Sequence, residues 1–238
     1  MPYFYGFDWT YLAIVLPCII LSLWASTSVK STFTRYSKQL SSRRITGAQA
    51  AQRVLSCNGV SGVRIERVSG NLTDHYDPKR NVIRLSDGVY DSTSTAAIGV
   101  ACHEAGHAVQ YAHHYAPIKL RAAIIPITNF GSKLAMPLIL LGLVLSFMGN
   151  FSYTLVYLGI ACFALSLVFQ LITLPVEFNA SRRALQAIDQ AELLTQSERV
   201  GAKKTLTAAA MTYVAAVAVS VAQLLRLIIL FGGRRRRD

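Results

Sequence analysis

The sequence predicts a mainly α-helical, polytopic membrane protein with a small α+β domain on its cytoplasmic side. Hydrophobic residues make up 53% of the 238 residues, which is too apolar for an ordinary soluble domain. They are gathered into segments long enough to cross a bilayer, with polar blocks between them. The expected organisation is an N-terminal transmembrane helix at 1–29, a cytoplasmic region at 30–132, a transmembrane hairpin at 133–174, a cytoplasmic helix at 175–206, and a C-terminal apolar helix with a basic tail at 207–238.

The first expected span runs from Trp9 to Ser26, with aromatic residues near both of its ends. No Lys or Arg precedes it, so it lacks the charged start of a cleavable signal peptide. Basic residues follow at once, at Lys30, Arg35 and Lys38. The positive-inside rule then places the N-terminus outside and the next polar block in the cytoplasm.

The formal net charge of +12 does not indicate a nucleic-acid partner, because the basic residues lie beside apolar spans and do not line an aromatic surface. We interpret them as topology signals and as contacts to anionic lipid, which makes the bilayer the expected partner. The four cysteines show no paired spacing. A disulfide framework is therefore not expected, in agreement with polar blocks that face a reducing cytoplasm.

The polar block that follows predicts one helix and two strands. Thr46 is placed to cap a helix that ends at Asn58-Gly59. Alternating apolar and polar residues indicate a strand at Val63–Val68, and a second strand is expected at Val82–Leu85. Asp77-Pro78 is typical of a turn, so we expect a hairpin that leads into the next helix.

That next helix is expected at Ala96–Ala112, and it contains the sequence HEAGH. On a helix, His103 and His107 lie four residues apart on one face, so two imidazoles can bind one metal ion while Glu104 flanks it. This is the HExxH pattern of zinc hydrolases. Gly106 lowers helix propensity, and we expect it to permit close packing near the metal.

Two apolar segments, Leu134–Phe151 and Tyr153–Leu174, predict a transmembrane hairpin whose tight turn lies around Gly149. A polar, helix-prone block starts near Pro175. The last apolar segment, Thr207–Phe231, fits either a fourth crossing or a re-entrant or interfacial helix. A crossing is favoured, although it would carry the basic run 234–237 outside, against the positive-inside rule.

A catalytic zinc site needs a third protein ligand. His113 follows His107 by six residues, as in metzincins, but Gln110 stands where that pattern requires glycine, so the helix is expected to continue. The favoured third ligand is Glu177, which follows the third span on the expected cytoplasmic side. Asp189 and Glu192 lie further along and are expected to be surface charges, which makes them the weaker acidic alternatives.

The motifs LTDHYDP, HEAGHAVQ and PVEFNASRRA, with a transmembrane hairpin between the last two, resemble the neutral zinc metallopeptidase family of bacterial membrane proteins (the YugP-like family). The layout is also similar to that of the HtpX-type membrane proteases. The resemblance implies a zincin-like domain in the bacterial inner membrane, facing the cytoplasm, with Zn²⁺ on His103, His107 and Glu177 and Glu104 as general base. Ser181 departs from the HtpX pattern, which has Asp there to orient a ligating histidine. Asp74 is an alternative source of that contact.

The hypothesis that follows is a zinc metalloendopeptidase that acts on protein or peptide substrates, in membranes or close to them. Zinc-activated water attacks the peptide carbonyl and Glu104 takes its proton. His75 is a second candidate catalytic residue, and Arg182 and Arg183 are alternative oxyanion donors. The rivals are an intramembrane protease of the site-2 type and a non-catalytic scaffold with a structural zinc. The sequence indicates no oligomeric state.

Overall fold

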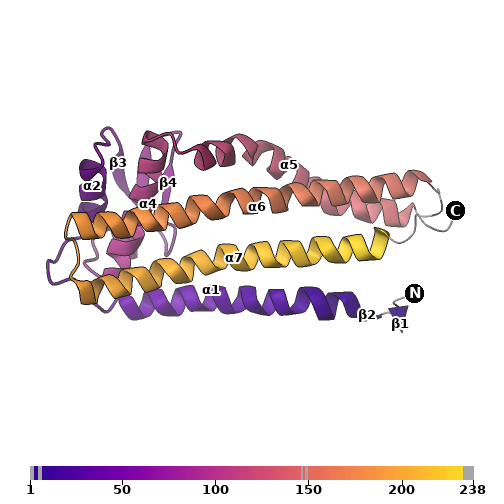
Figure 1. Ribbon diagram of the computed structural model, residues 1–238, viewed down its shortest axis with the longest axis horizontal. Helices are drawn as coiled ribbons and strands as arrows, with labels where there is room; N and C mark the ends of the chain where they lie inside the picture. Colours follow the sequence, from indigo (N-terminus) through magenta and orange to yellow (C-terminus); the bar gives the residue numbers. More distant parts are fainter. Residues whose placement is uncertain (1–2, 5–6, 146, 148–149, 233–238) are drawn as a thin grey trace. The chain divides into compact units, whose positions relative to one another are not determined.

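The computed structural model describes residues 3–4, 7–145, 147 and 150–232 and shows a mainly helical chain with one small mixed sheet (Figure 1). Among these residues, four helical segments are long and apolar enough to cross a membrane: Tyr11–Tyr36, Ala116–Val144, Phe151–Gln190 and Gln196–Gly232. The chain divides into two compact units, and each unit is assembled from separate stretches of sequence.

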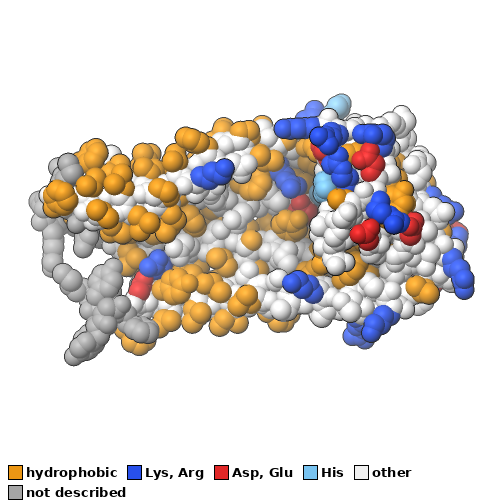
Figure 2. All heavy atoms as spheres, turned by 180° about the vertical axis from the view of Figure 1, so that it is seen from behind, with side chains coloured by type: hydrophobic (Ala, Val, Ile, Leu, Met, Phe, Trp, Pro, Cys, Tyr) orange, Lys and Arg blue, Asp and Glu red, His pale blue; other side chains and the backbone are white. Residues whose placement is uncertain are grey.

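The first unit contains the apolar helices and comprises residues 1–24, 120–174 and 213–238. Its elements are the two-residue strands β1 (Tyr3–Phe4) and β2 (Phe7–Asp8), a π-helical turn (Tyr11–Val15), the start of α1 (Leu16–Tyr36), most of α5 (Ala116–Val144), and parts of α6 (Asn150–Gln190) and α7 (Gln196–Gly232). Hydrophobic side chains cover much of the surface of these helices in Figure 2, as expected for surfaces that face lipid.

Glycine allows α5 and α6 to approach closely. A Cβ atom on Gly159 would lie 2.8 Å from the carbonyl oxygen of Ala135, and one on Gly142 would lie 2.7 Å from that of Ser152. Small residues at such contacts are a common means of packing helices in membranes. The expected hairpin of two apolar helices is therefore present, although α5 starts 18 residues before the predicted Leu134. The predicted turn residue Gly149 lies outside the described residues.

Polar side chains join α7 to other elements of the first unit. Gln170 and Ser220 exchange two hydrogen bonds, at 2.8 and 3.0 Å. Arg226 forms an ion pair with Asp8, and its Nε donates to Asp8 Oδ2 at 2.8 Å. Helix α7 is one unbroken helix from Gln196 to Gly232, and its crossing of the membrane stays a prediction. The basic run 234–237 lies outside the described residues.

The second unit comprises residues 25–119 and 175–212. It holds α2 (Gly47–Cys57), β3 (Arg64–Val68), β4 (His75–Asp77), β5 (Val82–Ser86), α3 (Asp87–Tyr90), α4 (Thr95–Ala112), and the remaining parts of α1, α6 and α7. The predicted cap at Thr46 is confirmed, because this residue forms a capping box with Gln49. At the start of α4, Ser94 accepts a hydrogen bond from the amide of Ala97.

The sheet has the order β3-β5-β4, and this differs from the expected hairpin. Strand β3 pairs with β5 in parallel. The antiparallel partner of β5 is β4, a strand of three residues that was not predicted from the sequence. Between β3 and β4 the chain turns through Gly70 and Leu72, both at positive φ. The predicted turn at Asp77-Pro78 does connect an antiparallel pair, and Asn81, at φ 52°, completes it.

The core of the second unit lies between the sheet and the helices. Strand β5 is central and almost fully buried, because Ile83 and Leu85 pack into a cluster with Leu55 of α2, Ile98 of α4 and Ile188 of α6. The charged side chain of Arg84 lies on the other face of the sheet. This core fixes α4 and α6 against each other.

Helix α6 continues through Pro175, where the sequence predicted the start of a separate polar helix. A proline inside a helix removes one backbone hydrogen bond, but packing on both sides of it can preserve the helix. Glu177 therefore lies two residues beyond a proline on a continuous helix of 41 residues.

Candidate metal centre

Helix α4 carries the HExxH sequence and presents both of its histidines on one face. The helix runs without a break from Thr95 to Ala112, so the four-residue spacing places the imidazoles one turn apart. The ring centroids of His103 and His107 are 4.7 Å apart, with an edge-to-face angle of 85°. Their Nε2 atoms both face Glu177 on helix α6.

Glu177 completes a group of three potential metal ligands. Its Oε2 lies 3.3 Å from His103 Nε2 and 3.5 Å from His107 Nε2. One ligand atom from each residue lies within 4.8 Å of the others. The side chain of Glu177 is only 3% exposed, and burial of a carboxylate at this depth requires compensating positive charge.

The donor set fits zinc. Two imidazole nitrogens and one carboxylate oxygen are the ligands of many catalytic zinc sites, with bonds of about 2.0–2.1 Å. In a tetrahedral arrangement, ligand atoms at that distance lie about 3.3–3.4 Å apart. The two nitrogen–oxygen distances observed here match this separation, and the three ligand atoms all lie within 4.8 Å of one another.

The electrostatics of the group also favour a cation. Burial of the imidazole acts to lower the pKa of His107, but the hydrogen bond to Glu177 and the charges of Glu104 and Glu177 outweigh it, so this pKa is raised. Positive charge at His107 Nε2 is therefore stabilised. A metal ion in contact with that nitrogen would benefit from the same two carboxylates.

The second nitrogen of each histidine has its own partner. His103 Nδ1 lies 3.1 Å from the hydroxyl of Ser181, the residue at which the sequence departs from the HtpX pattern. His107 Nδ1 donates to Gln110 Oε1 at 2.9 Å. Both rings are thus held with Nε2 directed toward Glu177.

Gly106 allows α4 and α6 to come close enough for this geometry. A Cβ atom at this position would lie 2.9 Å from the carbonyl oxygen of Ala180, and other backbone atoms of Ala180 would be 3.4 Å away. Real Cβ contacts of 2.9 Å to backbone are essentially never observed. The expected role of Gly106 in close helix packing is confirmed, and this packing lies beside His103 and His107 on the same helix.

Glu104 lies between the two histidines in sequence and is partly exposed. Within the described part of the chain its carboxylate has no hydrogen bond and no ion pair, but its charge acts on His107. A carboxylate without such partners can accept a proton from water. This position suits the expected general base.

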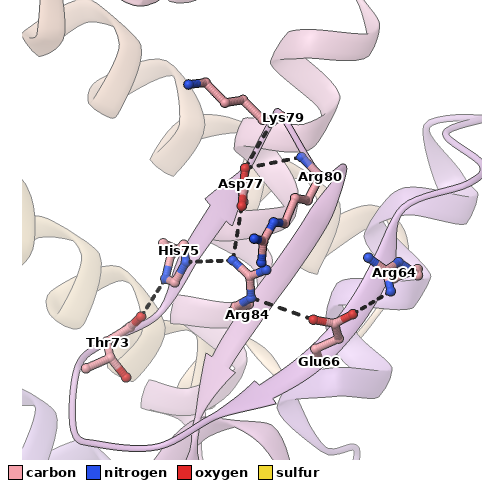
Figure 3. Close-up of polar contacts among 8 residues, drawn as sticks. All are labelled: Arg64, Glu66, Thr73, His75, Asp77, Lys79, Arg80 and Arg84. Atoms are coloured by element: carbon pink, nitrogen blue, oxygen red, sulfur yellow. Dashed lines mark hydrogen bonds and ion pairs between the residues drawn. The ribbon is translucent and has the colours of Figure 1, made fainter. Parts of the chain in front are cut away.

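His75 lies on the edge strand β4 and belongs to a different polar network (Figure 3). Its Nδ1 donates to the carbonyl of Thr73 at 2.8 Å, and its Nε2 accepts from Arg84 at 3.4 Å, since a guanidinium can only donate. Arg84 also pairs with Asp77 and Glu66. The structure does not bring His75 into the group of ligand atoms, and its catalytic role stays a prediction.

The other candidate ligands also lie apart from this group. His113 caps the C-terminus of α4, and its Nε2 bonds to the carbonyl of Asn58 at 3.3 Å. Glu192 pairs with Arg43 on the surface. Cys102 is fully buried, and burial raises the pKa of its thiol, which disfavours the thiolate that binds metal.

The remaining predicted polar residues have other partners. Asp74, the alternative orienting residue, accepts hydrogen bonds from the amide and hydroxyl of Ser86. Arg183 donates from Nε to Asn179 Oδ1 at 2.8 Å, and Arg182 is exposed. Whether either arginine stabilises an oxyanion stays a prediction.

Sequence reasoning missed the role of Gln110 and Asn179. Gln110 is fully buried, and its amide nitrogen donates to the carbonyl of Val176 and to Asn179 Oδ1. It was considered only as the residue that replaces the metzincin glycine. The sequence did contain a signal for this role, because Gln110 follows His107 by three residues and side chains at that spacing meet on one face of a helix.

Comparisons with known proteins agree with this geometry. A family model described as "Putative neutral zinc metallopeptidase" matches residues 11–232. The chain is 47% identical over 221 residues to the "Putative membrane protease YugP" of Bacillus subtilis (strain 168), and the match covers 93% of this chain and 96% of that protein. No solved structure matches the chain.

Proposed function

Because the chain belongs to the "Putative neutral zinc metallopeptidase" family, we propose that it is a membrane-embedded zinc endopeptidase whose metal ligands are His103, His107 and Glu177. The relative from Bacillus subtilis is named as a membrane protease, which supports the same reading. The observation that carries the proposal is the group of three ligand atoms within 4.8 Å, built from an HExxH helix and a glutamate of a second helix.

A catalytic zinc site differs from a structural one in its number of protein ligands. Structural sites fill four positions with protein atoms, often Cys, whereas catalytic sites use three and leave one position open. Three ligand residues form the group within the described residues, and Cys102 is not among them. This supports a catalytic site over a scaffold with a structural zinc.

Glu104 is the proposed general base. A zinc ion held by the three ligands supplies Lewis acidity, which makes water a nucleophile near neutral pH. The Glu104 carboxylate accepts a proton from the attacking water and then donates it to the nitrogen of the departing amine. Ser181 and Gln110 hold the two imidazoles in place, and Glu177 balances the positive charge.

The proposed substrates are membrane proteins or segments close to a membrane. The four candidate spans support a membrane location for the chain. Lys30 and Arg35 follow the apolar part of the first span, which supports a cytoplasmic location for the second unit under the positive-inside rule. In the bacterial inner membrane, such a site would act on cytoplasmic segments.

The test compares three proteins purified in detergent: the wild type, Glu104→Gln and a matched control, Glu192→Gln. Glu192 is also a glutamate of the second unit, but its side chain is 74% exposed. We expect one zinc per chain in all three and cleavage of an unfolded protein such as casein by the wild type and the control. Glu104→Gln should lose at least about 100-fold in turnover, the usual contribution of a general base.

His103→Ala should lose both zinc and cleavage. Full turnover in Glu104→Gln would refute its role as base. Tight zinc binding with no cleavage of any membrane-protein or soluble substrate would favour the scaffold.

A further inference from the structure

The structure assigns Gln110 as a positioning residue that selects the ring tautomer of His107. Gln110 lies one turn after His107 on α4 and is fully buried. Its side chain connects the helix that carries the two histidines to the helix that carries Glu177. The inference concerns the proposed zinc site and therefore rests on the proposed function.

The orientation of the Gln110 amide follows from its neighbours. The carbonyl of Val176 lies 2.8 Å from Gln110 Nε2 and can only accept, so the amide nitrogen must face it. The same nitrogen lies 3.0 Å from Asn179 Oδ1. That atom is an oxygen because Arg183 Nε, which can only donate, lies 2.8 Å from it. Both amide protons of Gln110 are thereby used on α6.

The tautomer of His107 follows from this orientation. With its nitrogen facing α6, Gln110 directs Oε1 toward His107 Nδ1 at 2.9 Å. An amide oxygen only accepts, so Nδ1 carries the proton. In a neutral imidazole the lone pair then resides on Nε2, the nitrogen that faces Glu177 at 3.5 Å. Metal binding requires this tautomer.

The same contacts couple ring orientation to helix packing. Gln110 is held by Val176 and Asn179, the residues that flank Glu177 on α6, so the acceptor for His107 is fixed relative to the third ligand. The Nδ1 atom of His103 faces the hydroxyl of Ser181, which can either donate or accept a hydrogen bond. Gln110 is thus the more specific of the two orienting contacts.

The test measures zinc affinity by competition with a chromophoric chelator, using the full chain in detergent. All proteins carry Glu104→Gln, so that the measurement does not depend on proteolysis. Gln110→Met keeps the size of the side chain and removes the acceptor, and Asn179→Ala removes one contact of Gln110 to α6 but leaves its acceptor oxygen for His107. Ile98→Ala is the control for lost stability, because Ile98 is buried on the same helix and contacts the hydrophobic core.

We expect Gln110→Met to weaken zinc binding by about 10- to 100-fold, the usual effect of removing a partner of a ligating histidine. Asn179→Ala should lose less affinity than Gln110→Met, because the acceptor for His107 remains, and Ile98→Ala should bind zinc as the parent protein does. The inference is overturned if Gln110→Met binds zinc with unchanged affinity, if Asn179→Ala is as weak as Gln110→Met, or if Ile98→Ala loses as much.

These outcomes separate the inference from the proposed function. Weak zinc binding by Gln110→Met supports the inference even if the wild type cleaves no substrate. Cleavage that depends on Glu104, together with unchanged zinc affinity in Gln110→Met, refutes the inference alone. A wild type that binds no zinc refutes both.

Discussion

Replacement of Gly106 by alanine should weaken zinc binding while leaving the fold nearly as stable. The added Cβ would lie 2.9 Å from the carbonyl oxygen of Ala180, and an ordinary contact needs about 3.4 Å. Helices α4 and α6 must therefore separate locally by about 0.5 Å. Both ligating histidines lie on α4 and Glu177 lies on α6, whereas zinc–ligand distances tolerate only about 0.2 Å of change.

The expected change in stability is small because two effects oppose each other. Alanine favours a helix over glycine by about 1 kcal/mol. Overpacking costs about 1–3 kcal/mol. The free energy of unfolding should therefore fall by about 0–2 kcal/mol, whereas zinc affinity should fall at least about tenfold.

Gly99→Ala provides the matched control for this substitution. Gly99 lies on the same helix, but its added Cβ would meet Ala202 of α7 at 3.1 Å and would not move α6. Zinc affinity by chelator competition and thermal unfolding should be measured on both variants. If Gly106→Ala binds zinc as tightly as Gly99→Ala does, the close approach of α4 and α6 does not set the geometry of the site.

Four further substitutions test other parts of the structure. His75→Ala should change kcat/KM by less than about threefold because both ring nitrogens already have partners, and a loss of 100-fold or more would assign it a catalytic role. Burial raises the pKa of Asp74 above 3.8 although hydrogen bonds from Ser86 oppose this, so the folded state holds that proton more tightly. The protonated Asp74 side chain therefore adds fully to the free energy of unfolding below pH 3.8, and this contribution is lost as pH rises through the raised pKa. In a zinc-free His103→Ala background, Asp74→Asn should lack this fall in stability when unfolding is measured against pH. Asp8→Asn and Arg226→Met should each lower thermal stability, with a coupling of about 0.5–3 kcal/mol in the double mutant; strict additivity would mean that their ion pair does not contribute.

The sequence predicted those features that depend on neighbouring residues. Helix α2 begins directly after the predicted cap Thr46, and α4 begins at Thr95, one residue before the predicted start. Thr46 and Ser94 each accept a hydrogen bond from the amide three residues later, so both helix starts are set locally. The face shared by His103 and His107 follows from helix geometry alone. Glu177 was favoured because few acids follow the HExxH helix, and the structure places it beside both histidines.

Features that depend on tertiary packing were not predicted. Strand β4 has three residues, too few for an alternating pattern, so the antiparallel hairpin was assigned to β3 and β5, which pair in parallel. Pro175 suggested the start of a helix, but α6 continues through this residue as one helix from Asn150 to Gln190. The function of Gln110 depends on Val176 and Asn179, which lie 66 and 69 residues away in sequence.

The second unit is interrupted in sequence by the stretch 120–174, and this has a consequence for biosynthesis. A ribosome completes the HExxH helix long before it adds Glu177, which follows His103 by 74 residues. Until then the nascent chain offers two imidazoles and no carboxylate from α6. The metal site can form only after the apolar stretch has been synthesised and the chain has returned to α4. The proposed peptidase site therefore stays incomplete during translation until Glu177 has been added and α6 packs against α4.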